Sequence, residues 1–121
     1  MGTLLKPLRW VGSSKGDLRR FPDAVQDCMG FAIYQAQIGL RHRDAKLLKG
    51  FGPGILEVAA RHGGDTYRAI YTVRFQAAVY VLHAFQKKAK RGIATPKKEL
   101  DLVRQRLRIA DRDHRGIQGR G

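Results

Sequence analysis

The stretch ILEVAARHGGDTYRAIYTVRFQAAVYVLHAFQ covers residues 55–86 and decides the fold. β-branched and aromatic residues, which favour strands, are concentrated in three runs, ILEVAA (55–60), TYRAIYTVRF (66–75) and AVYVLHAFQ (78–86). The connections RHGGD (61–65) and QA (76–77) are short enough for hairpins. The sequence therefore predicts an antiparallel meander of three strands.

Before the meander, the sequence predicts one short strand and two helices. KPLRWVG (6–12) alternates weakly between polar and apolar residues, as a strand does. In SSKGDLRRF (13–21), Ser14 and Asp17 have the spacing of a helix-capping pair. From Asp23 to about Leu40, apolar residues recur three and four positions apart, which predicts an amphipathic helix.

Two connecting segments separate this helix from the meander. Residues 44–49 are expected to form a turn of helix. The glycines of GFGPG (50–54) predict a loop. We do not interpret this loop as phosphate-binding, because no strand precedes it and no Lys-Ser/Thr pair follows it.

A final helix is predicted after the meander. Thr95 and Pro96 form an N-cap pattern, and an apolar stripe continues to about Ala110. Residues 111–121 have no apolar pattern and are expected to form a mobile tail. The predicted fold is α+β, with residues 1–121 in a single domain.

Composition points to a polyanionic partner. The chain has 121 residues and a formal net charge of +14, which favours nucleic acid, an anionic membrane surface or an acidic protein. No apolar run is long enough to span a membrane, and the N-terminus lacks the pattern of a secretory signal, so we expect a cytoplasmic protein. The single cysteine, Cys28, allows no internal disulfide and is expected to be a core residue.

The excess charge is concentrated in one part of the chain. Between Thr66 and Lys98 there is no acidic residue. The same stretch contains many bases: Arg68, Arg74, Lys87, Lys88, Lys90, Arg91, Lys97 and Lys98. This pattern is typical of a nucleic-acid interface, although basic loops are also common on ordinary solvated surfaces.

The period of the strands predicts which side chains meet. One face of strand 66–75 is apolar and is expected to be core, whereas Arg68, Ile70, Thr72 and Arg74 form a half-polar second face. In the next strand, Val79, Val81, His83, Phe85 and Lys87 are expected to share a face. The hairpin then allows Arg68, His83 and Lys87 to converge, and His83 is either a titrating site residue or a packed core histidine. No metal-ligand spacing is visible, and no cofactor is expected.

The segments LEVAARHGGDTYRAIYTV and AVYVLHAFQKKAKRGIATPKKEL resemble the RelE/ParE superfamily of bacterial toxins, in particular its HigB-like, phage-derived branch. The most specific likeness lies in YRAIY (67–71), HAFQKK (83–88) and TPKKEL (95–100). The resemblance implies a fold in which N-terminal helices pack on a small twisted antiparallel sheet, followed by a C-terminal helix.

The resemblance also implies a function. Ribonuclease members are toxins of type II toxin–antitoxin modules that cleave mRNA on the ribosome without metal. The substrate 2′-hydroxyl attacks its adjacent phosphate, so the protein has only to bind the phosphate, stabilise charge and move protons. A cognate antitoxin, a small helix-turn-helix protein, is the expected partner. It is expected to neutralise the protein either by covering Arg68 and the 87–91 loop or by blocking entry into the ribosome through its bulk. A ParE-like gyrase inhibitor and a non-catalytic RNA- or ribosome-binding module remain alternatives.

Residue roles follow from the same resemblance. Arg68 matches the arginine that contacts the scissile phosphate, Lys87 or Lys88 matches a second basic group, and His83 is the candidate for proton transfer. The expected RNA-binding residues are Arg74, Lys90, Arg91, Lys97 and Lys98. The chain departs from some ribonuclease members in having Glu57 and Ala59 where they carry lysines, and in having no tyrosine after Tyr80.

Overall fold

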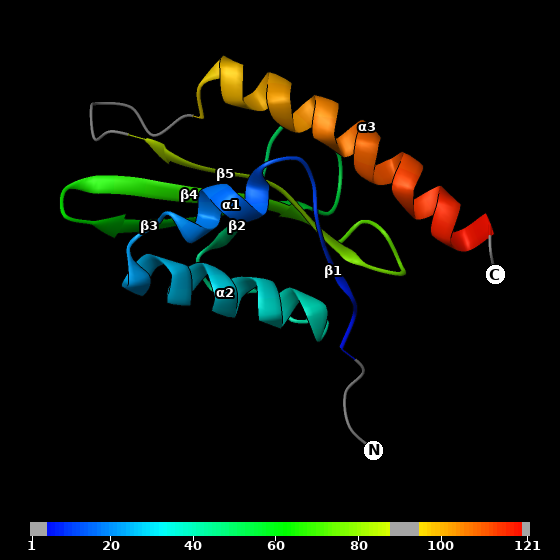
Figure 1. Ribbon diagram of the computed structural model, residues 1–121, viewed down its shortest axis with the longest axis horizontal. Coiled ribbons are helices and arrows are strands. Elements are labelled where there is room, and N and C mark those ends of the chain that lie inside the picture. Colours follow the sequence, from blue (N-terminus) through cyan, green and yellow to red (C-terminus); the bar gives the residue numbers. More distant parts are fainter. Residues whose placement is uncertain (1–4, 88–94, 120–121) are drawn as a thin grey trace.

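Five strands form one sheet in the order β1-β5-β4-β3-β2 (Figure 1). The computed structural model describes residues 5–87 and 95–119. The strands are β1 (Leu8–Trp10), β2 (Ala45–Leu47), β3 (Ile55–His62), β4 (Asp65–Thr72) and β5 (Val79–Lys87). The three long strands pair antiparallel in sequence order, so the predicted meander is confirmed.

The turn between β3 and β4 explains the tight pairing of these strands. Gly63 and Gly64 have φ angles of 59° and 85°. A two-residue type I′ turn requires positive φ at both positions, which glycine adopts without strain. Because of this turn, the register continues to His62 opposite Asp65.

The connection between β4 and β5 is longer than the predicted two residues. β4 ends at Thr72, whose side-chain oxygen donates to the carbonyl of Gly54 at 2.9 Å. Val73 N also donates to this carbonyl at 2.9 Å. The chain therefore leaves the ladder before residue 74 and returns at Val79.

The sheet edges correct two predictions. β1 pairs parallel with β5, so the sheet is mixed and not purely antiparallel. Segment 44–49 contains strand β2 and not a turn of helix. Pairing with β3 buries Ala45 against the core, and this tertiary contact outweighs the weak local preference.

Two helices cover one face of the sheet (Figure 1). α1 (Ser14–Arg19) begins after Ser13, so the N-cap is one residue earlier than the predicted Ser14. The Ser13 hydroxyl donates to Asp17 Oδ2 at 2.7 Å and makes no capping hydrogen bond to the backbone. α2 (Asp23–Gln37) confirms the amphipathic helix but ends before Leu40. Its buried stripe contains Val25, Met29, Ala32, Ile33 and Ala36.

The third helix, α3 (Lys97–Gly119), lies across the opposite face of the sheet (Figure 1). It begins after Pro96, and the hydroxyl of Thr95, the predicted cap, donates to Glu57 instead. Ile70 packs in one cluster with buried residues of α3, and Ile70 and Thr72 are both fully buried, so the second face of β4 is not a half-polar surface as expected.

The predicted tail is helical over its described part. α3 continues past Ala110 to Gly119. Two hydrogen bonds attach this extension to β5 and the loop before it: Tyr80 donates to Asp113 Oδ2 at 2.6 Å, and Ala77 N donates to His114 Nε2 at 3.0 Å. The apolar pattern of the sequence does not reveal such polar contacts. His114 is buried accordingly.

Candidate functional site

The register of β4 and β5 brings three predicted site residues to one face of the sheet. Arg68 lies opposite Phe85, Ile70 opposite His83, and Thr66 opposite Lys87. Cross-strand partners share a face, and residues two apart on a strand share it too. Arg68, His83 and Lys87 are therefore on one face of these two strands, as expected.

A β-bulge changes the predicted face pattern of β5. Tyr71 pairs with Val81, but Ile70 pairs with His83, so Leu82 is the extra residue on β5. An extra residue reverses the alternation beyond it. Val79 and Val81 consequently pack in the α1–α2 cluster, whereas Phe85 packs on the α3 side. The expectation that all five alternating residues share one face is wrong for this reason.

Arg68 is buried and paired with a carboxylate. Its Nη1 lies 2.6 Å from Glu57 Oε1, and only 10% of its side chain is exposed. The other oxygen of Glu57 accepts a hydrogen bond of 2.7 Å from Thr95. This pairing explains why β3 carries an acid here: an unpaired guanidinium at this depth would be costly.

His83 lies between a carboxylate and a guanidinium. Its Nε2 is 3.2 Å from Glu99 Oε1, and its Nδ1 is 3.4 Å from Arg106 Nη1. Arginine can only donate, so Nδ1 is the acceptor and Nε2 carries the proton toward Glu99. The ring also stacks on Phe85, with centroids 4.9 Å apart.

The electrostatic surroundings of His83 favour its neutral form. Burial lowers its pKa below the ordinary value of 6.5, Glu99 opposes this effect, and Arg106 adds to it. The main cause of the lowered pKa is therefore loss of water, and the positive charge of Arg106 is a lesser cause. A neutral imidazole is the form that can accept a proton.

His83 and Glu99 line an open hollow with a volume of about 340 Å³. Asp17 of α1 and Arg20, which directly follows α1, line the same hollow. Thus an imidazole–carboxylate pair and an exposed guanidinium border a space that a ligand can enter.

Arg106 was missed by the sequence analysis. It is only 9% exposed, donates to Leu82 O at 3.0 Å and to Ser13 Oγ at 3.0 Å, and so joins α3 to β5 and to the start of α1. Burial lowers its pKa. Its position between Val103 and Ala110 on the buried stripe of α3 was the available signal, because a charge within an apolar stripe is unusual.

The remaining predicted site residues lie apart from this group or outside the described residues. Lys97 and Lys98 are exposed at the start of α3, and Lys97 Nζ lies 3.1 Å from Asp101. Arg74 follows the other end of β4, where it donates to Pro53 O at 3.2 Å and to the carbonyl of Phe51. Arg74 therefore supports the glycine-rich loop. Lys87 is half-buried, whereas Lys88, Lys90 and Arg91 lie outside the described residues.

Within residues 5–87 and 95–119, no group of three or more histidine, cysteine, aspartate or glutamate side chains is arranged to hold a metal ion. None of the helices found there has the length and apolar character needed to cross a membrane.

Comparisons with known proteins identify the family. The family described as "Phage derived protein Gp49-like" matches residues 16–108. Among solved structures, the chain is similar to a chain of the RelBE2 toxin–antitoxin complex from Mycobacterium tuberculosis, at 20% sequence identity and a TM-score of 0.40. That match covers 73% of this chain and 98% of the other. No curated protein matched. The chain belongs to the phage-derived Gp49-like family, a family of RelE/HigB-type toxins.

Proposed function

We propose that this protein is the toxin of a type II toxin–antitoxin module and acts as a metal-independent endoribonuclease on mRNA bound to the ribosome. The observation that supports this proposal best is the common face of β4 and β5 that carries Arg68, His83 and Lys87. Membership of a toxin family supports the same function.

In the proposed reaction the RNA supplies its own nucleophile. The 2′-hydroxyl gives up its proton to a base and attacks the adjacent phosphorus. The bond to the 5′-oxygen of the next nucleotide breaks, this oxygen takes up a proton and leaves as a hydroxyl, and a 2′,3′-cyclic phosphate remains. Arg68 binds the phosphate and stabilises its developing negative charge, an effect worth on the order of 3 kcal/mol for one well-placed donor. Lys87 or Lys88 supplies a second positive charge.

His83 is the proposed proton carrier. Its lowered pKa keeps the imidazole neutral and able to accept a proton, and Glu99 stabilises the imidazolium that forms. The contact with Arg106 at 3.4 Å has to open before Nδ1 can reach the substrate. His83→Gln should therefore reduce cleavage about 10²-fold or more.

RNA binding at Arg68 involves competition with Glu57. The carboxylate of Glu57 holds the guanidinium at 2.6 Å, in the place that a phosphate oxygen would take. Lys90, Arg91, Lys97 and Lys98 are proposed to bind the flanking phosphates. Arg74 is left out, because its guanidinium supports the loop before β3.

The test is to incubate the purified protein with translating ribosomes and to map mRNA ends by primer extension. Cuts within the translated frame that disappear when ribosomes are omitted support the proposal. Intact mRNA together with inhibited DNA supercoiling by gyrase would favour the ParE-like alternative. Binding to ribosomes without either effect would favour the non-catalytic module.

A further inference from the structure

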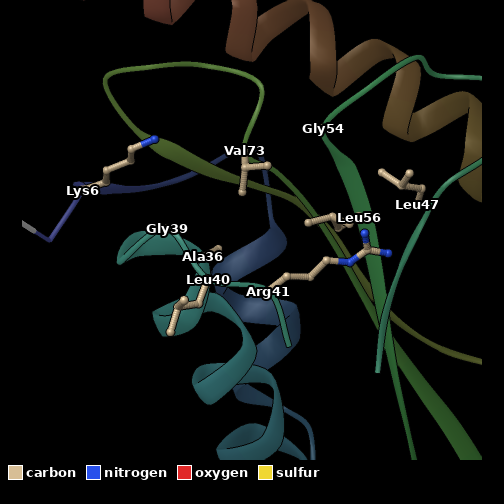
Figure 2. Close-up of a pocket in the computed structure, with 9 residues that line it drawn as sticks. All are labelled: Lys6, Ala36, Gly39, Leu40, Arg41, Leu47, Gly54, Leu56 and Val73. Atoms are coloured by element: carbon tan, nitrogen blue, oxygen red, sulfur yellow. The ribbon is translucent and has the colours of Figure 1, made fainter. Parts of the chain in front are cut away.

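A second hollow, on the α2 side of the sheet, belongs to neither Arg68 nor His83. It has a volume of about 430 Å³ and lies between the end of α2, β2 and β3 (Figure 2). We call it the α2–β2 pocket. The lining residues that matter here are Lys6, Leu40, Arg41, Leu47, Leu56 and Val73. None of the residues proposed for catalysis lines it.

The pocket has exposed apolar walls. Leu40 is 57% exposed and Leu47 is 55% exposed, whereas Leu56 at its base is buried. Large side chains that surround a hollow while remaining in water are typical of an interaction surface. Figure 2 shows Leu40 and Leu47 on two sides of the space, with the Arg41 side chain between them in this view.

The charged side chains that line the pocket are both basic. Lys6 and Arg41 line it, and Arg41 is held in place because its Nε and Nη2 donate to Ala45 O at 3.2 and 3.0 Å. A neighbouring hollow of about 440 Å³ shares Arg41 and includes Phe31 and Arg43. Among the described residues that line these two hollows, none is acidic.

We infer that the α2–β2 pocket binds an acidic segment of the antitoxin, which inserts large apolar side chains between Leu40 and Leu47 and places carboxylates against Lys6 and Arg41. An apolar centre with charged residues at the rim is the usual composition of a protein–protein interface. Nucleic acid would satisfy the two cations but would leave the leucines uncovered. The inference rests on the proposed function, since it names a binding surface for the partner of that toxin.

In this assignment the antitoxin neutralises the toxin by binding at a surface other than the one that carries Arg68 and Lys87. The sequence led us to expect an antitoxin that either covers the basic residues or blocks ribosome entry by its bulk. A partner held at the α2–β2 pocket leaves Arg68 and Lys87 uncovered by this contact, so the inference favours the second of these alternatives.

The test uses the full chain and the product of the reading frame that adjoins its gene, co-expressed and then measured as purified proteins by calorimetry. In the double variant Leu40→Glu/Leu47→Glu, two exposed side chains become acidic, so folding should be retained while the Kd rises at least about tenfold. Co-expression should no longer restore growth. Lys6→Glu should weaken the complex in the same direction, with a slower association rate.

Ile109→Glu is the matched control, because Ile109 is an exposed apolar residue on α3, at 43% exposure. It should bind like the wild type. Unchanged affinity in the double variant, or equal loss in the control, would overturn the inference, as would a wild-type dimer that the double variant abolishes. A wild-type chain that does not bind the adjoining product at all overturns it as well. Absence of growth arrest by the wild type expressed alone would instead refute the toxin function.

Discussion

At the scale of single residues, the pairing of Arg68 with Glu57 raises the question of whether Arg68 serves stability, catalysis or both. A buried guanidinium with a carboxylate at 2.6 Å has a structural role whatever its chemistry. Removing one partner of such a pair typically costs about 3–5 kcal/mol, because the other charge is left buried and uncompensated. Loss of toxicity in Arg68→Ala alone would therefore not separate catalysis from folding.

A double substitution separates the two roles. Arg68→Ala should lower both stability and cleavage. Adding Glu57→Gln removes the stranded charge and should recover most of the lost stability, while cleavage stays low. Glu57→Gln alone should cleave at least as well as the wild type, because it removes the competitor of the phosphate. Urea unfolding and primer extension measure the two properties, and recovery of cleavage in the double variant would contradict a role in phosphate binding.

The pKa of His83 predicts a pH dependence of stability. Because burial lowers its pKa, the unfolded chain binds a proton at higher pH than the folded chain does. The stability that His83 contributes is present above its ordinary pKa and is lost as pH falls from about 6.5. His83→Gln should therefore lose less stability than the wild type between about pH 7.5 and pH 5. Thermal unfolding across this range tests the prediction, with the exposed His62→Gln as control. Parallel curves for wild type and His83→Gln would contradict it.

At the scale of elements, the attachment of α3 to β5 depends on Arg106 and on the close approach of Gly12. Gly12 has a φ of 57°, and a Cβ there would lie 2.8 Å from Arg106 Nε. This backbone angle strains a residue that has a side chain, and a Cβ would push the Arg106 guanidinium aside. Glycine between β1 and α1 therefore allows the close approach of Arg106.

Gly12→Ala should destabilise the protein by roughly 1–3 kcal/mol, through backbone strain and displacement of Arg106. Gly16→Ala is the matched control, because Gly16 lies within α1 and a Cβ there meets nothing within 4 Å. Alanine in a helix interior should be neutral or stabilising by up to about 1 kcal/mol. The denaturant midpoints of the two variants test this prediction. Equal midpoints would show that the contact between Gly12 and Arg106 does not contribute to stability.

The contribution of the last turns of α3 to the free energy of unfolding should also be measurable. A chain that ends at Ala110 loses the hydrogen bond from Tyr80 to Asp113 and the one from Ala77 to His114. Together these are worth roughly 2–4 kcal/mol, the larger share belonging to the charged acceptor. Calorimetric unfolding of the truncated and full chains tests this value. If the two chains have the same Tm, residues 111–119 behave as the mobile tail that their composition suggested.

At the scale of the whole molecule, the net charge of +14 predicts salt-dependent RNA binding. Each phosphate neutralised on single-stranded RNA contributes about −0.7 to the slope of log affinity against log salt. Lys97→Gln/Lys98→Gln should flatten this slope by about one unit or more. Lys46→Gln/Lys49→Gln, which removes the same charge from exposed positions around β2, should change it less. Equal slopes for the two variants would mean that RNA does not track the start of α3.

The sequence by itself determined the elements with strong local patterns. The glycine pair at 63–64 and the β-branched runs around it specify the meander, because turn chemistry and strand preference act within a few residues. The spacing of apolar residues from Asp23 specifies α2 in the same way. The absence of acids from 66 to 98 also predicts a basic surface, and the use of that surface for RNA stays a prediction.

Only the tertiary structure revealed the features that depend on contacts between residues distant in the sequence. Strand β2 exists because β3 lies beside it, and α3 extends past Ala110 because Tyr80 and Ala77 bond to it. The bulge at Leu82 turns His83 toward Glu99 and Arg106, although alternation alone placed it with Val79 and Val81. An insertion of one residue in a ladder is set by packing on both faces of the sheet, and no local pattern of this sequence encodes it.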